Sequence, residues 1–239
     1  MVPRDPNILV SVLLPTRGRP HRLVQSMGSL FNHALNKPSI EFLLKVDDDD
    51  KETLDFLKNS IDASSRVRVF CSPRGNGYRD MHLWINHLAS QARGKWLIIW
   101  NDDAMMLTPQ WDHIVEYCAP LDNVWHGVDD IICKVPAINN VVGCTAFFFL
   151  NRKVVELLGR FSYVPHCDTW VSKMMQAVDS LLYMPMVYVV HDEEHKDKIW
   201  QEAEPHRTTS EFTSRNVEGM GVRIKDSLKL HEYIATRKK

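Results

Sequence analysis

Hydrophobic residues in the first hundred positions form short continuous runs separated by segments with helical spacing. The runs are apolar enough to be strands buried on both faces of a sheet. They are Ile8–Pro15, Ile40–Val46, Arg66–Ser72 and Lys95–Trp100. Helical spacing occurs between them, from about 21 to 34, in 53–61 and in 81–92. This alternation predicts an α/β fold with a largely parallel sheet covered by helices.

Beyond Pro109 the pattern is less regular. We expect an apolar strand within 139–152, a short helix closed by Gly159, a helix with Asp168 at its start, and a strand over 180–190 that ends at His191. The last fifty residues are more polar and finish in a basic tail. With no repeat or linker, we expect one domain over 1–191 and a C-terminal extension, 192–239, folded on or over the cleft.

Unusual polar residues follow each of the first strands. In open α/β sheets, ligands bind beyond the carboxyl ends of the strands, so these residues are expected to share one cleft. They are Thr16, Arg17 and Arg19 after the first strand, Asp47–Asp50 after the second, a turn at 73–77 after the third, and Asn101–Asp103 after the fourth.

Composition narrows the classes of partner. The chain of 239 residues has a formal net charge of −1, which gives no global reason to expect binding to nucleic acid or membrane. No apolar run approaches the roughly 20 residues that span a bilayer, and the N-terminus reads poorly as a signal peptide. The five cysteines are scattered without a CxxC pair, which disfavours a zinc knuckle or a disulfide framework. We therefore expect a cytoplasmic protein.

Arginines and carboxylates in one cleft predict a metal-bound diphosphate. Arg17 and Arg19 can each bind diphosphate oxygens bidentately. A nearby carboxylate repels the diphosphate, at a cost of about 4 kcal/mol for a separation of 4 Å and an effective dielectric near 20. A divalent cation, Mg²⁺ or Mn²⁺, between carboxylate and phosphate removes this conflict. The phosphate-binding motifs GxxxxGK[ST] and GxGxxG behind the first strand are absent, which disfavours kinases, P-loop ATPases and Rossmann dehydrogenases.

The order of these motifs resembles that of the family 2 glycosyltransferases. The similarity runs from about Ile8 to His191 through "SVLLPTRGRP", "LLKVDDDD", "PRGNGYRDMHLWIN", "GKWLIIWNDD", "GCTAFFFLNR", "GRF", "HCDTW" and "VVH". It implies the GT-A fold, a Rossmann-like mixed sheet sandwiched by helices, and a nucleotide-sugar donor, with UDP as the default nucleotide. Compact enzymes of this kind also occur in bacteriophages.

The resemblance also implies roles for single residues. Thr16 and Arg17 stand where the diphosphate is met, and Asp47 or Asp48 where an acid contacts the base or ribose. In the DXD-like "NDD", Asp103 would be the main metal ligand and Asp102 would contact the sugar or ribose. His191 matches the histidine that completes the metal and diphosphate site, and Asp168 matches the general base, although Cys167 replaces the acid that often precedes it. One base and one metal imply inversion of the transferred sugar.

Several alternatives stay open at this point. Asp168 can equally be a helix cap, "DDDD" a solvated capping run, and the glycines of "PRGNGY", Gly77 among them, either a plain turn or a point of close approach to a nucleotide. Trp170 can be core or can stack on an acceptor ring. A nucleotidyltransferase and a non-catalytic nucleotide-sugar-binding module remain rival functions. The acceptor (glycan, lipid, protein or hydroxymethylated DNA) is open.

Overall fold

The computed structural model describes residues 1–61, 66–118, 135–138, 147–184, 186–191 and 210–237. Its strands are β1 (Val10–Thr16), β2 (Ile40–Asp47), β3 (Val67–Ser72), β4 (Trp96–Ile99), β5 (Ala104–Met106), β6 (Val135–Ile138), β7 (Phe147–Asn151), β8 (Leu181–Tyr183) and β9 (Val189–His191). Its α-helices are α1 (Pro20–His33), α2 (Lys51–Ser60), α3 (Met81–Gln91), α4 (Trp111–Cys118), α6 (Arg152–Leu158), α7 (Cys167–Ala177) and α9 (Ser210–Arg237). Two short 3₁₀ turns are η1 (Lys37–Ser39) and η2 (Gly77–Asp80).

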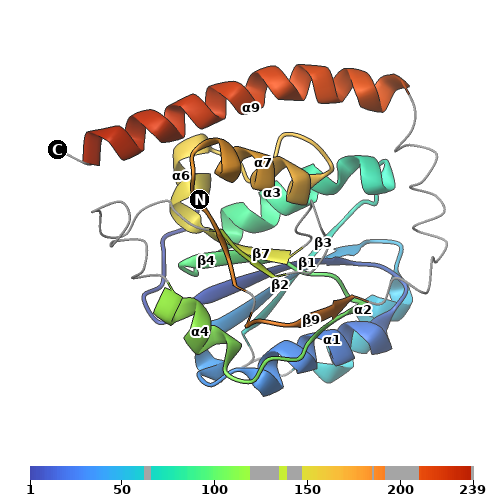
Figure 1. Cartoon of the computed structure of the whole chain (residues 1–239). Coiled ribbons are helices and arrows are strands. Elements are labelled where there is room, and N and C mark those ends of the chain that lie inside the picture. The colour runs from blue at the N-terminus through green and yellow to red at the C-terminus, as the bar shows by residue number, and fades with distance from the viewer. Residues whose placement is uncertain (62–65, 119–134, 139–146, 185, 192–209, 238–239) are drawn as a thin grey trace.

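The strands form a large mixed sheet and a small separate ribbon. The seven-stranded sheet has the order β3-β2-β1-β4-β7-β6-β8, and β5 and β9 form the ribbon. Strands β1 to β4 run parallel, while β7 is antiparallel to β4. Figure 1 shows this sheet between two layers of helices, with α1, α2 and α4 on one face and α3, α6 and α7 on the other. The predicted α/β architecture with a mixed sheet is confirmed.

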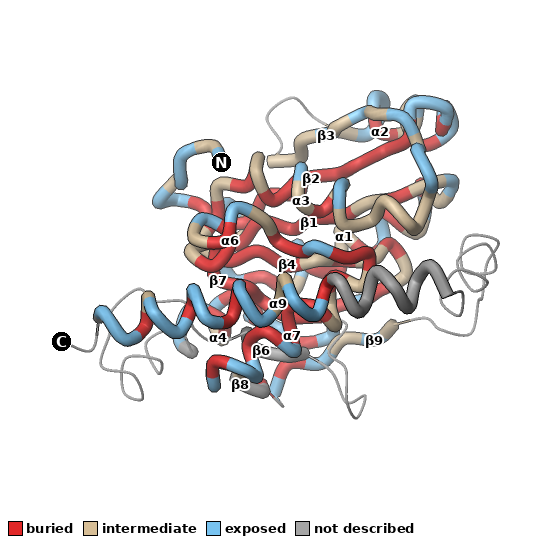
Figure 2. The backbone as a smooth tube through the Cα atoms, turned by 90° about the horizontal axis from the view of Figure 1, so that it is seen from above, coloured by how far each residue is buried: buried red, intermediate tan, exposed pale blue. Residues whose placement is uncertain are grey.

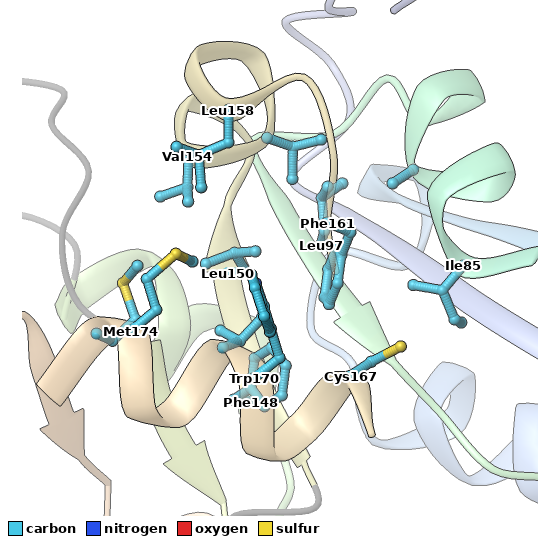
Figure 3. Close-up of a cluster of buried hydrophobic side chains, with 14 of the residues drawn as sticks. Ile85, Leu97, Phe148, Leu150, Val154, Leu158, Phe161, Cys167, Trp170 and Met174 are labelled. Atoms are coloured by element: carbon cyan, nitrogen blue, oxygen red, sulfur yellow. The ribbon is translucent and has the colours of Figure 1, made fainter. Parts of the chain in front are cut away.

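Alternate strand residues divide the core between the two faces of the sheet, because successive side chains of a strand point in opposite directions. Leu13, Leu43 and Leu97 pack with α3, α6 and α7. Val12, Leu44 and Ile98, one residue away along the sequence in each strand, pack with α1, α2 and α4. The first cluster is drawn in Figure 3, and the central strands are buried along their length in Figure 2. Both faces of these strands are buried, which explains their continuous apolar runs.

The structure corrects one expectation from the sequence and adds elements that were not predicted. The single strand expected over 180–190 is two strands in different sheets, β8 and β9. Pro185 lies between them outside the described residues, and proline has no N–H to donate to a sheet ladder. Strand β5, directly after Asp103, and helix α4 were not predicted. The helix expected to close at Gly159 is confirmed as α6, and Gly159 adopts the left-handed φ of 77° that favours glycine there.

The C-terminal helix α9 forms an outer layer on α6 and α7, where Figure 1 shows it lying across the molecule. Leu230 and Ile234 are buried in the first core cluster, and Asp226 pairs with Arg160 at 2.6 Å. None of the described helices is both long and apolar enough to cross a bilayer. Residues 192–209, between β9 and α9, lie outside the described residues, so the covering role of the extension stays a prediction.

Two leucines on the same helix test whether α9 belongs to the cooperative core. Leu230 is fully buried and Leu228 is 56% exposed. We expect Leu230→Ala to lower the free energy of unfolding by about 2–5 kcal/mol, because it removes buried methyl groups and leaves a cavity. Leu228→Ala should change it by no more than about 0.5 kcal/mol. Urea denaturation of the full chain measures both values, and equal losses would contradict this packing of α9.

Candidate active site

The carboxylate of Asp102 lies buried just beyond the carboxyl end of β4, and both of its oxygens are bound by residues at the end of β1 or shortly after it. The Thr16 hydroxyl donates a 2.6 Å hydrogen bond to its Oδ2, and Arg19 Nη2 lies 2.7 Å from its Oδ1. Asp102 is only 2% exposed. These contacts neutralise the charge and fix the loop after β1 to the end of β4. The predicted convergence of these two strand ends is therefore confirmed.

Asp103 lies near the same guanidinium as Asp102 and also contacts His191. Its Oδ1 lies 3.1 Å from His191 Nε2, and its Oδ2 lies 3.6 Å from Arg19 Nη1. The amide of Asn101 lies 3.1 Å from the same imidazole nitrogen, and the ring of Phe147 packs perpendicular to the imidazole at 5.4 Å. The β5–β9 ribbon makes this meeting possible, since Ala104 pairs with His191 across it.

Asp103 is held in its ionised form. Burial raises its pKa, but contact with His191 and the charges of His191 and Arg19 outweigh that effect and leave the pKa below its ordinary value. A carboxylate and an imidazole therefore present an oxygen and a nitrogen to one point, beside a guanidinium.

A second cluster gathers around Arg17. Its guanidinium binds the buried carboxylate of Asp47 at 2.8 Å and forms a bidentate contact with the exposed carboxylate of Asp49. The hydrogen bond to Asp49 is the largest influence that raises the pKa of Arg17, and the same contact lowers the pKa of Asp49. The other oxygen of Asp47 accepts from Lys45, whose Nζ lies 4.1 Å from the centre of the Trp84 ring. Two cations thus share Asp47.

The remaining aspartates of "DDDD" have separate tasks. Asp50 accepts a 2.7 Å hydrogen bond from the backbone N–H of Gly18 and caps α2 by accepting from the N–H of Thr53 at 3.3 Å. Asp48 is exposed. The interpretation as a helix cap is therefore right for Asp50, while Asp47 and Asp49 hold the arginine of the neighbouring loop.

Gly77 and Asp168 belong to two elements that are in contact, η2 and the start of α7. Gly77 begins η2 with a left-handed φ of 60°, and the ring of Tyr78 beside it packs edge-on against His166 at 5.9 Å. His166 is the N-cap of α7, so Asp168 lies inside the first turn and is not the cap, contrary to one of the two readings from the sequence. Asp168 is half-buried.

Two neighbours of Asp168 on α7 belong to the core. Trp170 is 1% exposed, so the suggestion that it stacks on an acceptor ring is wrong. Cys167, 4% exposed, lies in the same cluster, as Figure 3 shows. Burial raises the pKa of its thiol to about 12. A thiol that stays neutral cannot act in place of the carboxylate that Cys167 replaces in the sequence pattern.

The residues around Asp103 fit a divalent cation that is completed by its substrate. Asp102 is already compensated by Arg19 and Thr16, so Asp103 and His191 are the two side chains here whose donor atoms could hold an ion. Within the described part of the chain, no three His, Cys, Asp or Glu side chains form a metal-binding group. Mg²⁺-type sites in which substrate phosphates supply further oxygens commonly use only one or two protein ligands. The two-ligand set therefore suits a metal–diphosphate site.

Lys45 and Gly18 were not singled out from the sequence, and Asn101 and Asp49 were placed at strand ends without a partner. Asn101 contacts His191, Asp49 and Lys45 complete the Arg17 cluster, and Gly18 ties the β1 loop to α2. Only Lys45 had a usable signal, because a lysine in the mostly apolar run "FLLKV" needs a buried partner.

The chain is similar to known glycosyltransferases in sequence and in fold. The family model "Glycosyl transferase family 2" matches residues 11–157. Among curated proteins, none matches this chain in sequence. The structure of S. aureus TarS 1–349 in complex with UDP is similar, with a TM-score of 0.54 and 12% identity over 92% of this chain and 81% of that chain.

Two further solved structures have a similar fold. TarS 1–349 with UDP-GlcNAc gives a TM-score of 0.53 and 12% identity over 95% of this chain and 83% of that one. The mannosyltransferase PcManGT of Pyrobaculum calidifontis, in complex with GDP-Man and Mn²⁺, gives 0.57 and 14% over 92% of this chain and 64% of that one. At such low identity these likenesses establish the GT-A fold alone.

Cysteine alkylation tests the environment of α7. Only the thiolate is nucleophilic, so buried Cys167 should resist iodoacetamide at about pH 8, whereas exposed Cys71 should react. Peptide mass spectrometry of the native protein measures both sites, and the same treatment in guanidinium chloride should modify both. Modification of Cys167 in the native protein at the rate of Cys71 would contradict the placement of this helix.

Proposed function

Because this chain belongs to glycosyl transferase family 2, and so is a glycosyltransferase that takes its sugar from a nucleotide-sugar, we propose that it acts with a divalent cation and inverts the transferred sugar. The observation that carries the proposal is the meeting of Asp103 and His191, beside Arg19, at the carboxyl edge of the sheet.

Local charge supports the need for a cation. Asp102 and Asp103 place two carboxylates against the single charge of Arg19, and carboxylates would repel a diphosphate. Asp103 and His191 would hold Mn²⁺ or Mg²⁺, and the bound ion would supply Lewis-acid stabilisation to the departing nucleoside diphosphate. Arg19 would then face the diphosphate oxygens from the side of Asp102. Asp102 itself is enclosed by the protein with both oxygens bound, so it would hold Arg19 in place and would not make the contact with the sugar or ribose that the sequence had suggested.

The Arg17 cluster would form the nucleotide side of the cleft. Asp47 is fixed by Lys45 and Arg17 and is suited to contact the base or ribose, with exposed Asp48 beside it. Arg17 can exchange its exposed partner Asp49 for a diphosphate, because exposed ion pairs contribute little stability. Gly77 would allow close backbone approach. UDP is our default nucleotide, supported by the UDP and UDP-GlcNAc complexes of TarS, and GDP is the alternative suggested by PcManGT.

Asp168 is the proposed general base. It is a half-buried carboxylate in the first turn of α7, next to η2, and could accept the proton of an acceptor hydroxyl. Since Cys167 is neutral, this position offers one base and no second nucleophile, which favours direct displacement with inversion.

The rival functions have less support. A nucleotidyltransferase usually carries a Gly-rich loop after the first strand, whereas "PTRGRP" has the single Gly18, and the family match also favours transfer. A binding module without chemistry would release no nucleoside diphosphate. The near-neutral charge does not favour hydroxymethylated DNA as acceptor over a glycan, protein or lipid.

Removal of the metal ligand tests the donor half of the mechanism. Asp103→Asn should lower Mn²⁺-dependent release of nucleoside diphosphate from UDP- and GDP-sugars by about a hundredfold or more, because a group that stabilises developing charge is lost. Asp55→Asn, an exposed carboxylate on α2, should leave the rate unchanged. The measurement is a coupled assay of released UDP or GDP. Full activity of Asp103→Asn would contradict the proposed metal site.

Substitution of the proposed base separates transfer from donor binding. Asp168→Asn should reduce sugar transfer by about 10²–10⁴-fold while the donor Kd, measured by calorimetry with Mn²⁺, stays within about twofold. Asp179→Asn, just beyond the same helix at a left-handed position that Asn tolerates, is the matched control. Transfer at the normal rate by Asp168→Asn would exclude this residue as the base.

A further inference from the structure

Helix α9 meets the chain that leads into α7 at Gly219, which is buried. A Cβ atom at this position would lie 3.0 Å from Cγ1 of Val164 and 3.5 Å from Cζ3 of the Trp170 ring. Carbon atoms in van der Waals contact are about 3.5–4.0 Å apart, so a side chain here would require Val164 to move. Glycine therefore lets α9 lie against residues 161–166, which we call the α7 entry.

Helix α3 holds the α7 entry through one side chain, the amide of Asn86. Its Oδ1 accepts hydrogen bonds from the backbone N–H groups of Phe161 at 2.8 Å and Ser162 at 3.0 Å, and its Nδ2 donates to the carbonyl of Ser162 at 2.7 Å. These bonds use both lone pairs of the amide oxygen and one amide hydrogen. A group introduced at Gly219 would therefore press on a segment that α3 already holds.

The α7 entry is hydrogen-bonded to the first turn of α7. The N–H of Cys167 donates to the carbonyl of Pro165 at 2.9 Å, and the N–H of Trp170 donates to the carbonyl of His166 at 2.9 Å. Asp168 lies between these two anchored residues of the helix. A displacement of the α7 entry would therefore carry Asp168 with it.

Close approach, and not buried side-chain volume, is what Gly219 contributes to the packing of α9. Further along the helix, Leu230 and Ile234 supply apolar side chains to the core. His231 fixes α9 against the end of α7, with its Nε2 2.9 Å from the carbonyl oxygen of Ala177. Because α9 has these other anchors, the short distance at Gly219 matters mainly for the position of the α7 entry.

The inference rests on the proposed function, in which Asp168 is the general base. We propose that Gly219 is a positioning residue for that carboxylate. The close approach of α9 sets where the α7 entry lies, and the entry sets where the first turn of α7 presents Asp168 to the acceptor hydroxyl. A base must lie within hydrogen-bond reach of the proton it accepts, and a misplacement of 1 Å can lower a rate about a hundredfold. Through this contact α9 contributes to the reaction rate.

A second glycine on the same helix provides the matched control. Gly221 is exposed, and a Cβ atom there would have nothing within 4 Å. The reaction measured is Mn²⁺-dependent hydrolysis of UDP- and GDP-sugars, in which water serves as the acceptor. We expect Gly219→Ala to lower kcat about threefold to tenfold and Gly219→Leu about a hundredfold, because the larger side chain displaces the α7 entry further. Gly221→Ala and Gly221→Leu should stay within about twofold of the wild-type rate.

The Michaelis constant for the donor separates positioning from a general loss of structure. It should stay within about twofold in all four variants, because the change affects the base and not the proposed donor site. A parallel loss of donor binding would contradict the proposal. Equal losses of kcat in the Gly219 and Gly221 variants would contradict it as well.

Removal of the opposing methyl group tests the contact itself. Val164→Ala deletes Cγ1, the atom that a Cβ at Gly219 would meet at 3.0 Å. The double variant Gly219→Ala/Val164→Ala should therefore recover kcat to within about twofold of Val164→Ala alone. A loss of the same size in both backgrounds would overturn the proposal. If Gly219→Leu does not fold, the alanine variants decide by this criterion.

Combination with Asp168→Asn tests whether the effect acts through the base. Added to Asp168→Asn, Gly219→Ala should cause no further loss of kcat, because the carboxylate that it displaces is already gone. Losses that multiply would refute the positioning role. A wild-type rate of Asp168→Asn by itself would instead exclude Asp168 as the base, which is a failure of the proposed function.

Alkylation of Cys167 reports on the α7 entry without turnover. In native Gly219→Leu this thiol should react with iodoacetamide about tenfold faster than in the wild type, because displacement of the entry exposes a side chain that is otherwise buried. Gly221→Leu should protect it as the wild type does. Unchanged protection in Gly219→Leu would refute the coupling of α9 to α7. Failure of the wild-type protein to release nucleoside diphosphate from any donor would contradict the proposed function and leave the alkylation result standing.

Discussion

Neutralisation of one buried carboxylate holds the candidate active site together. Asp102 lies almost fully inside the protein, where an unpaired charge would cost several kcal/mol. Thr16 and Arg19 supply the hydrogen bond and the opposite charge, and both belong to the segment that leaves β1. The loop after β1 is therefore fixed at the end of β4. With Asp102 turned inward, adjacent Asp103 is left to face His191, so two neighbouring aspartates have different environments and different chemistry.

Helix α1, which covers one face of the sheet, also supports this arrangement. The hydroxyl of Ser26 bridges the backbone oxygens of Asn101 and Ala104 and accepts from the indole of Trp100, and Ser29 accepts from the N–H of Met106. The helix that covers one face of the core thus also holds β5 in place. Because β5 in turn pairs with β9, α1 indirectly positions His191. The ribbon joins the fold to the candidate site, because its inner face belongs to the core and its end brings His191 to Asp103.

The two arginine clusters differ in how readily they can rearrange. Arg19 is bound to a buried carboxylate, so its position depends on the fold itself. Arg17 shares its charge between buried Asp47 and Asp49, whose side chain is 58% exposed, and solvent makes the second contact easily replaced. Under the proposed function, donor binding would therefore rearrange the contacts of Arg17 more than those of Arg19.

Periodicity along the chain was sufficient to predict β1 to β4, the helices between them and the α/β class, because apolar spacing reports which sides of an element are buried. The polar residues at the strand ends, Thr16, Arg19, Asp102 and Asp103 among them, could also be assigned to one edge of a parallel sheet. Sequence reasoning failed where neighbours along the chain carry little information, as in the division of 180–190 into β8 and β9. Only the tertiary structure decided which aspartate is buried, which acid each arginine binds, and that Asn101 and His191, 90 residues apart, lie in contact. Local pattern determines the exposure of a side chain on its own element, whereas its partner depends on how distant elements pack.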